Sequence, residues 1–140
     1  MAIPAKLLLE IVTPDRSLVR EEVDEVQVPG AEGYLGVLPG HAPLLATLKV
    51  GELWYRVGQA RYYLAIAGGF IEVLPDRVTV LAQIAERARE IDVARAEAAR
   101  KRAEERLARP SPDMDLERAR VALMKALIRL QVATRAHTRV

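Results

Sequence analysis

Residues 71–82 read Ile-Glu-Val-Leu-Pro-Asp-Arg-Val-Thr-Val-Leu-Ala. Apolar residues recur at every second position on both sides of the Pro-Asp pair: Ile71 and Val73 before it, and Val78, Val80 and Ala82 after it. This period is typical of half-buried β-strands, and proline followed by aspartate favours a turn. The stretch therefore predicts a β-hairpin.

The same alternation runs through the residues before this hairpin. It is seen in Leu7, Leu9 and Ile11, in Val26 and Val28, and in Leu53, Tyr55 and Val57. All 8 glycines of the chain lie at or before Gly69, where they can supply turns and bends. Many short strands at such spacing predict an all-β sandwich or barrel over residues 1–86.

Residues 87–140 are rich in alanine, arginine, glutamate and leucine, which favour helix, and contain no glycine. Two prolines in Arg109-Pro110-Ser111-Pro112-Asp113 exclude one continuous helix, so the segment predicts an antiparallel two-helix hairpin. Ser111 is the expected N-cap of the second helix, with Pro112 at its first position. The expected packing stripes are Ala94, Ala98, Ala99, Ala103 and Leu107 on the first helix, and Leu116, Ala119, Leu123, Leu127 and Leu130 on the second. Because alanines bury little apolar area, such a hairpin could open without unfolding the strands.

Charge separates the two halves. Residues 1–85 hold 7 Lys/Arg and 10 Asp/Glu, a net charge of −3, whereas residues 86–140 hold 14 and 9, a net charge of +5. The chain has 0 cysteines, which excludes disulfides and thiolate metal sites, and no metal site is expected. No run of apolar residues is long enough for a membrane span and the start lacks the features of a signal peptide, so a soluble, cytoplasmic protein is expected.

One segment, residues 33–44, reads Gly-Tyr-Leu-Gly-Val-Leu-Pro-Gly-His-Ala-Pro-Leu. It closely resembles the G-E-L-G-I-L-P-G-H-A-P-L stretch of epsilon subunits of bacterial F-type ATP synthases. Further matches follow in the same order at residues 12–15, 68–73 and 78–82, and the resemblance continues through the helices. It implies a β-sandwich of about ten strands followed by two antiparallel helices. Tyr34 departs from the family, in which many members carry glutamate.

The resemblance also implies a function. The chain is expected to be a non-catalytic central-stalk subunit that couples the catalytic head to the proton-translocating c-ring and inhibits ATP hydrolysis through its hairpin. Its expected partners are the gamma subunit, the c-ring and the beta and alpha subunits, at the cytoplasmic face of the inner membrane and peripheral to it. Tyr34, His41 and Pro43 are expected at the interface with the c-ring or gamma. His41 is interpreted as ordering its proline-flanked loop, not as a general base or metal ligand.

A second motif, Ile91-Asp92-Val93-Ala94-Arg95-Ala96, matches the I/L-D-x-x-R-A motif of epsilon subunits that bind ATP. No cofactor is expected to be required, but regulatory ATP, with or without magnesium, is the implied ligand. The residues implied in that site are Glu86, Ile91, Asp92, Arg95, Ala96, Arg102, Lys125 and Arg129. Asp92 is implied on the base or ribose side. Lys125 stands where ATP-binding members carry arginine, which removes a planar fork from the site.

Two other functions remain open on the sequence alone. The basic hairpin could make the chain an anion- or nucleic-acid-binding adaptor, although the helices contain no aromatic residue for base stacking. The sandwich could instead be a small-molecule binding module, which would require an apolar cavity. For the charges of the hairpin, the simplest alternative is a solvated face without a ligand.

Overall fold

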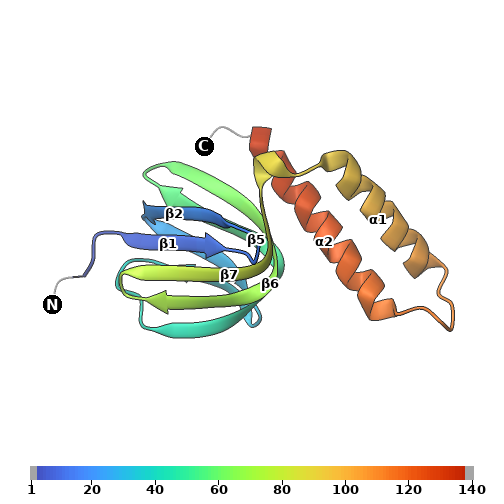
Figure 1. Ribbon diagram of the computed structural model, residues 1–140, viewed down its shortest axis with the longest axis horizontal. Coiled ribbons are helices and arrows are strands. Elements are labelled where there is room, and N and C mark those ends of the chain that lie inside the picture. Colours follow the sequence, from blue (N-terminus) through green and yellow to red (C-terminus); the bar gives the residue numbers. More distant parts are fainter. Residues whose placement is uncertain (1–2, 138–140) are drawn as a thin grey trace.

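The computed structural model describes residues 3–137 and has two parts, a folded β-sheet and a pair of helices beside it (Figure 1). The strands are β1 (Leu7–Val12), β2 (Ser17–Val23), β3 (Glu25–Gly30), β4 (Gly33–Val37), β5 (Leu44–Val57), β6 (Ala60–Leu74) and β7 (Arg77–Arg87). A single 3-10 turn, η1 (Ala88–Glu90), leads into α1 (Val93–Ala108) and α2 (Leu116–Thr134), and η2 (Arg135–His137) follows. The predicted sandwich with a two-helix hairpin is confirmed.

The seven strands form one sheet in the order β2-β1-β7-β6-β5-β3-β4. All neighbours are antiparallel except β1 and β7, which pair in parallel. The hairpin expected at Pro75-Asp76 joins β6 to β7, with Leu74 opposite Arg77. About ten strands were expected, and seven are found between residues 3 and 137. The difference arises because β5, β6 and β7 are 14, 15 and 11 residues long, and each would count as two shorter strands if it were divided.

The core lies between the two halves of the folded sheet. Leu7 and Leu9 of β1 and Val26 and Val28 of β3 are all fully buried in one cluster, although these strands lie far apart in the sheet order. The sheet must therefore fold over on itself, which makes it a sandwich. The inward faces predicted from period-two alternation are the buried faces found here.

The three long strands bend at one row. Pairing is interrupted at Lys49, Gly68 and Gln83, and resumes in the same register on both sides. Across this row the buried positions change parity, from Ile66 to Ile71 in β6. Gly69 has φ +125°, and a Cβ placed there would lie 2.1 Å from the carbonyl oxygen of Leu81. Only glycine fits such a close approach of two backbones, so the bend depends on it.

The helices begin at aspartates. Asp92 caps α1 by accepting a hydrogen bond from the Arg95 backbone N–H at 3.1 Å. Asp115 caps α2 in the same way, accepting from Arg118 N–H at 3.0 Å. The prediction of Ser111 as the second cap is wrong: its carbonyl instead accepts from Met114 N–H at 3.1 Å and closes a turn.

The helix faces also differ from the expected stripes. Ala94 and Ala98 are exposed, and Leu116 and Leu127 are 40% and 46% exposed. Apart from Val132, which packs against the sheet, the buried residues are alanines spaced by seven: Ala96 and Ala103 on α1, and Ala119, Ala126 and Ala133 on α2. Small residues at this spacing let two helices approach closely, and the leucines are displaced to the flanks of the seam.

The hairpin rests on the outer face of the sheet through α2. A small cluster joins Val132 and Ala133 of α2 to Ala65 of β6 and Ile91 of the linker. α2 contacts β5 and β6, and α1 packs on α2 from outside (Figure 1). The linker is itself tied to the sheet, because Arg16 pairs with Glu90 at 2.8 Å and the Arg87 guanidinium donates to the Leu18 carbonyl. The Arg16 hydrogen bond holds the pKa of Glu90 below its usual value.

We expect Gly69→Ala to lower the free energy of unfolding by about 2 kcal/mol or more, since the added Cβ meets backbone and the positive φ disfavours it. Gly36→Ala is the control, because a Cβ at Gly36 meets nothing within 4 Å. It should change the free energy by less than about 1 kcal/mol. Denaturant unfolding of the two variants measures both values. Equal losses at the two positions would contradict a steric requirement at Gly69.

Candidate functional site

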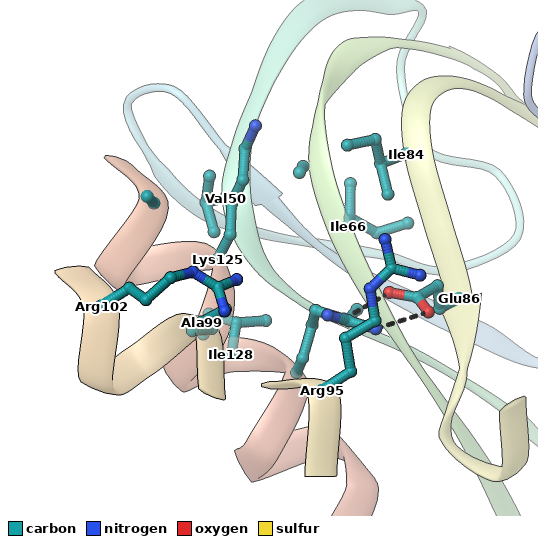
Figure 2. A pocket seen from close by; sticks show the side chains of 14 residues that line it. Val50, Ile66, Ile84, Glu86, Arg95, Ala99, Arg102, Lys125 and Ile128 are labelled. Atoms are coloured by element: carbon teal, nitrogen blue, oxygen red, sulfur yellow. Dashed lines mark hydrogen bonds and ion pairs between the residues drawn. The ribbon is translucent and has the colours of Figure 1, made fainter. Parts of the chain in front are cut away.

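A cleft of about 420 Å³ lies between the hairpin and the outer face of the sheet. Its floor is apolar and comes from β5, β6 and β7, and its helical wall contains small residues and cations (Figure 2). The lining residues are Val50, Ala65, Ile66, Ala67, Ile84, Glu86, Arg95, Ala99, Arg102, Ala122, Lys125, Ala126, Ile128 and Arg129. The cleft exists only while the hairpin rests on the sheet, because neither part forms it alone.

Four cations and one carboxylate line this cleft, so its formal charge is positive. Arg129 of α2 donates to both oxygens of Glu86 of β7, at 2.7 and 3.2 Å. Arg95, Arg102 and Lys125 point into the cleft (Figure 2), and their side chains pair with no other residue within 3–137. These three cations come from both helices and are free to meet an anion.

Of the eight residues implied in a nucleotide site, five line the cleft: Glu86, Arg95, Arg102, Lys125 and Arg129. The other three do not line it and have structural contacts. Ile91 is buried against α2, Ala96 is fully buried in the helix seam, and the Asp92 side chain caps α1. The motif around Asp92 therefore positions Arg95, and only Arg95 of its residues lines the cleft.

The residues expected at a rotor interface lie on β4 and the loop after it. Tyr34 is 55% exposed, and its hydroxyl accepts a hydrogen bond from Glu52 N–H at 3.4 Å. His41 is partly exposed and its Nδ1 donates to the Ala42 carbonyl at 2.6 Å, while Pro43 is exposed. Leu38, Leu44 and Leu45 in the same region are also exposed. This apolar surface is available to a partner.

Sequence reasoning missed a second contact between hairpin and sheet, and assigned no role to Arg135. Its guanidinium donates to both oxygens of Glu52 at 3.2 and 3.3 Å, and lies 4.7 Å from the centre of the Tyr63 ring. The Glu52 hydrogen bonds raise the pKa of Arg135 further above its usual value. No local signal could have revealed the pair, because its members are 83 residues apart.

Two family models match the chain in succession. The first, ATP synthase, Delta/Epsilon chain, beta-sandwich domain, matches residues 6–88, and the second, ATP synthase, Delta/Epsilon chain, long alpha-helix domain, matches residues 89–134. The chain belongs to the ATP synthase delta/epsilon chain family. The resemblance seen in residues 33–44 is confirmed, and it spans both parts of this delta/epsilon-type chain.

Individual relatives of this chain support the same family assignment. It is 56% identical to the ATP synthase epsilon chain of Syntrophobacter fumaroxidans, over 91% of this chain and 96% of that one. It is 53% identical to the epsilon chain of Solibacter usitatus, over 93% and 97%. Among solved structures, a chain of the Euglena gracilis mitochondrial ATP synthase (OSCP/F1/c-ring) has a TM-score of 0.83 at 26% identity, covering 96% of this chain and 84% of that chain.

We expect Asp92→Ala to destabilise α1 by about 1 kcal/mol, because the cap of its first turn is lost, and Asp92→Ser to restore most of it. Hydrogen exchange of the α1 amides measures this. The same two variants separate capping from ligand contact. If Asp92 also contacts a nucleotide, serine will restore the helix but not the affinity for ATP.

Proposed function

We propose that this chain is the epsilon subunit in the central stalk of a bacterial F-type ATP synthase, and that it carries out no chemistry of its own. Family domains over residues 6–134 and the likeness to a chain of an F1/c-ring assembly support this. The exposed apolar end with Tyr34 and His41 would meet gamma and the c-ring, and the hairpin would reach the beta and alpha subunits. Neither helix of the described part has the length and apolar character needed to cross a bilayer. The proposed location, which follows from the proposed place in the central stalk, is peripheral, at the cytoplasmic face of the inner membrane.

In this proposal the hairpin regulates ATP hydrolysis. The observation that carries it is the limited hold of the hairpin on the sheet, which consists of one small apolar cluster and the ion pairs of Arg129 and Arg135. A part held this lightly can exchange between a compact state, described here, and an extended state that docks elsewhere. A ligand shifts such an equilibrium only by binding one state better than the other. Docking between beta and gamma would favour the extended state and block rotation.

Truncation after Ala88 should raise ATP hydrolysis by the assembled synthase while ATP-driven proton pumping continues. The physical reason is that, within residues 3–137, Ala85 is the last residue of the sandwich core, so the truncated chain keeps its fold and its rotor contacts. Hydrolysis and pumping assays on the same membranes measure both effects. Loss of pumping would mean that the hairpin is needed for coupling, and would overturn the division of roles.

Regulatory ATP is the proposed ligand of the cleft. Arg95, Arg102 and Lys125 offer unpaired cations from both helices, and a polyphosphate that contacts both helices would tie them to the compact state. The apolar floor of Val50, Ala67 and Ile84 suits a flat base. The cleft volume of about 420 Å³ falls within the range of roughly 300–1,000 Å³ that is typical of small-ligand sites.

If ATP binds there, Arg95→Ala and Arg102→Ala should each remove a charge-assisted contact worth about 1.5 to 3 kcal/mol and raise the Kd about tenfold or more. Lys125→Arg should lower the Kd, because a planar fork replaces a point charge. Calorimetry of the isolated subunit, with and without magnesium, measures these changes.

Arg106→Ala is the matched control, since Arg106 is exposed on α1 and does not line this cleft. It should leave the Kd nearly unchanged. No heat of binding at millimolar ATP, or equal effects of Arg95→Ala and Arg106→Ala, would leave the cations as a solvated face.

A further inference from the structure

Glu52 is the one buried charged or polar residue between residues 3 and 137, with 7% of its surface exposed. It lies on β5 next to Leu53, which points into the sandwich core. Because neighbouring side chains of a strand point to opposite faces, Glu52 is on the outer face of the sheet, where α2 and η2 cover it. A carboxylate removed from water in this way is unfavourable unless a cation meets it.

Arg135 is that cation, and it is held by two groups of the sheet at once. Both Glu52 oxygens accept from its guanidinium, at 3.2 and 3.3 Å, and the guanidinium lies over the Tyr63 ring of β6. A paired carboxylate and an aromatic face are both suited to a planar guanidinium, more than to a lysine. None of the three residues lines the cleft.

Arg135 follows α2, so its contact with Glu52 holds the second end of the hairpin on the sheet. The hairpin leaves the sheet at the linker, where Arg87 and Glu90 are tied to the strand β2 and the turn before it. The far end of α2 returns to the same place, and η2 contacts η1 (Figure 1). With Arg135 in place, both ends of the hairpin are fixed to the sandwich. The hairpin can swing away only after Arg135 has left Glu52.

We propose that Glu52, Tyr63 and Arg135 form a latch that holds the hairpin in the compact state, and that the latch acts independently of any ligand in the cleft. The Glu86–Arg129 pair differs in this respect, because it lines the cleft and a bound anion competes for Arg129. The latch thus sets the compact population in the absence of ligand. Its effect on hydrolysis rests on the proposed function, whereas its effect on the hairpin does not.

Thiol labelling tests the latch directly, because the chain has 0 cysteines. Val132→Cys places one thiol in the fully buried contact of α2 with the sheet, where it reacts only when the hairpin lifts. In this background Arg135→Met, which keeps the apolar stem, leaves Glu52 buried without a partner. The labelling rate should rise about tenfold or more. Arg106→Met, an exposed arginine of the same hairpin, is the matched control and should leave the rate unchanged.

A double variant distinguishes a latch from a general loss of packing. Glu52→Gln removes the unpaired charge, so the Arg135→Met/Glu52→Gln chain should label more slowly than Arg135→Met alone. A thiol at Val28→Cys in the sandwich core reports global unfolding, and Arg135→Met should not change its labelling rate. Equal rates for Arg135→Met and Arg106→Met, simple addition of the Glu52 and Arg135 effects, or faster labelling at Val28→Cys would each overturn the latch.

The same variants separate the latch from the regulatory role. Measured with and without ATP, the fold-change caused by Arg135→Met should be the same, and a change confined to the ATP-bound protein would overturn ligand independence. In the assembled synthase, Arg135→Met should lower ATP hydrolysis if the freed hairpin inhibits. Faster labelling with unchanged hydrolysis would support the latch and contradict the proposed inhibition.

Discussion

The close approach of β6 and β7 at Gly69 is the constraint on which both parts of the molecule depend. Because the three long strands bend together there, the sheet can fold over and enclose its core. The same bend changes which side chains face outward. Before it, Ala65 and Ala67 of β6 form a smooth outer surface, whereas Phe70 after it is 54% exposed. The small residues provide the surface on which α2 rests, so the hairpin's docking site follows from the fold of the sandwich.

That docking surface explains why the hairpin is held in one position and can still detach. Alanines at Ala65, Ala126 and Ala133 allow close contact but bury little apolar area, and apolar burial contributes only about 25 cal/mol per Å². Two ion pairs between the hairpin and the sheet determine the position in which the hairpin docks. Glu86–Arg129 secures the C-terminal part of α2 and Glu52–Arg135 the turn that follows it, and both pairs are partly shielded from water. Partly shielded pairs in a defined geometry define the docked position better than a larger apolar area would.

The sequence was sufficient for the strands and for the existence of the hairpin, because both follow from local patterns. Period-two alternation placed Leu7, Leu9 and Ile11 on the buried face, and the two prolines near Ser111 separated the helices. Which helix residues pack could not be obtained in this way. Ala94 and Ala96 are the same residue type with the same helix propensity, and only the position of α2 decides that Ala96 is buried.

The site was partly predictable for a similar reason. The resemblance supplied the five charged residues of the cleft, but it did not indicate that the Asp92 side chain caps α1. The cap was readable in principle, since an aspartate before an alanine-rich helix is a common start signal. The Glu52–Arg135 contact was not. Glu52 has the alternation of an exposed strand residue, and its burial depends on a chain end that arrives 83 residues later.

The charges of the cleft and of the latch act in opposite directions on the compact state. Docking places Arg95, Arg102 and Lys125 of the hairpin over the apolar floor of the cleft, and without an anion the water that they lose there disfavours docking. The Glu52–Arg135 pair, which lies outside the cleft, favours docking whether or not an anion is bound. A ligand changes the population of such an equilibrium most where the two opposing terms nearly cancel, since a small change in free energy then produces a large change in population. The latch and the unpaired cations are therefore parts of one balance: a stronger latch would move it toward the compact state, and a further unpaired cation in the cleft would move it toward the extended state.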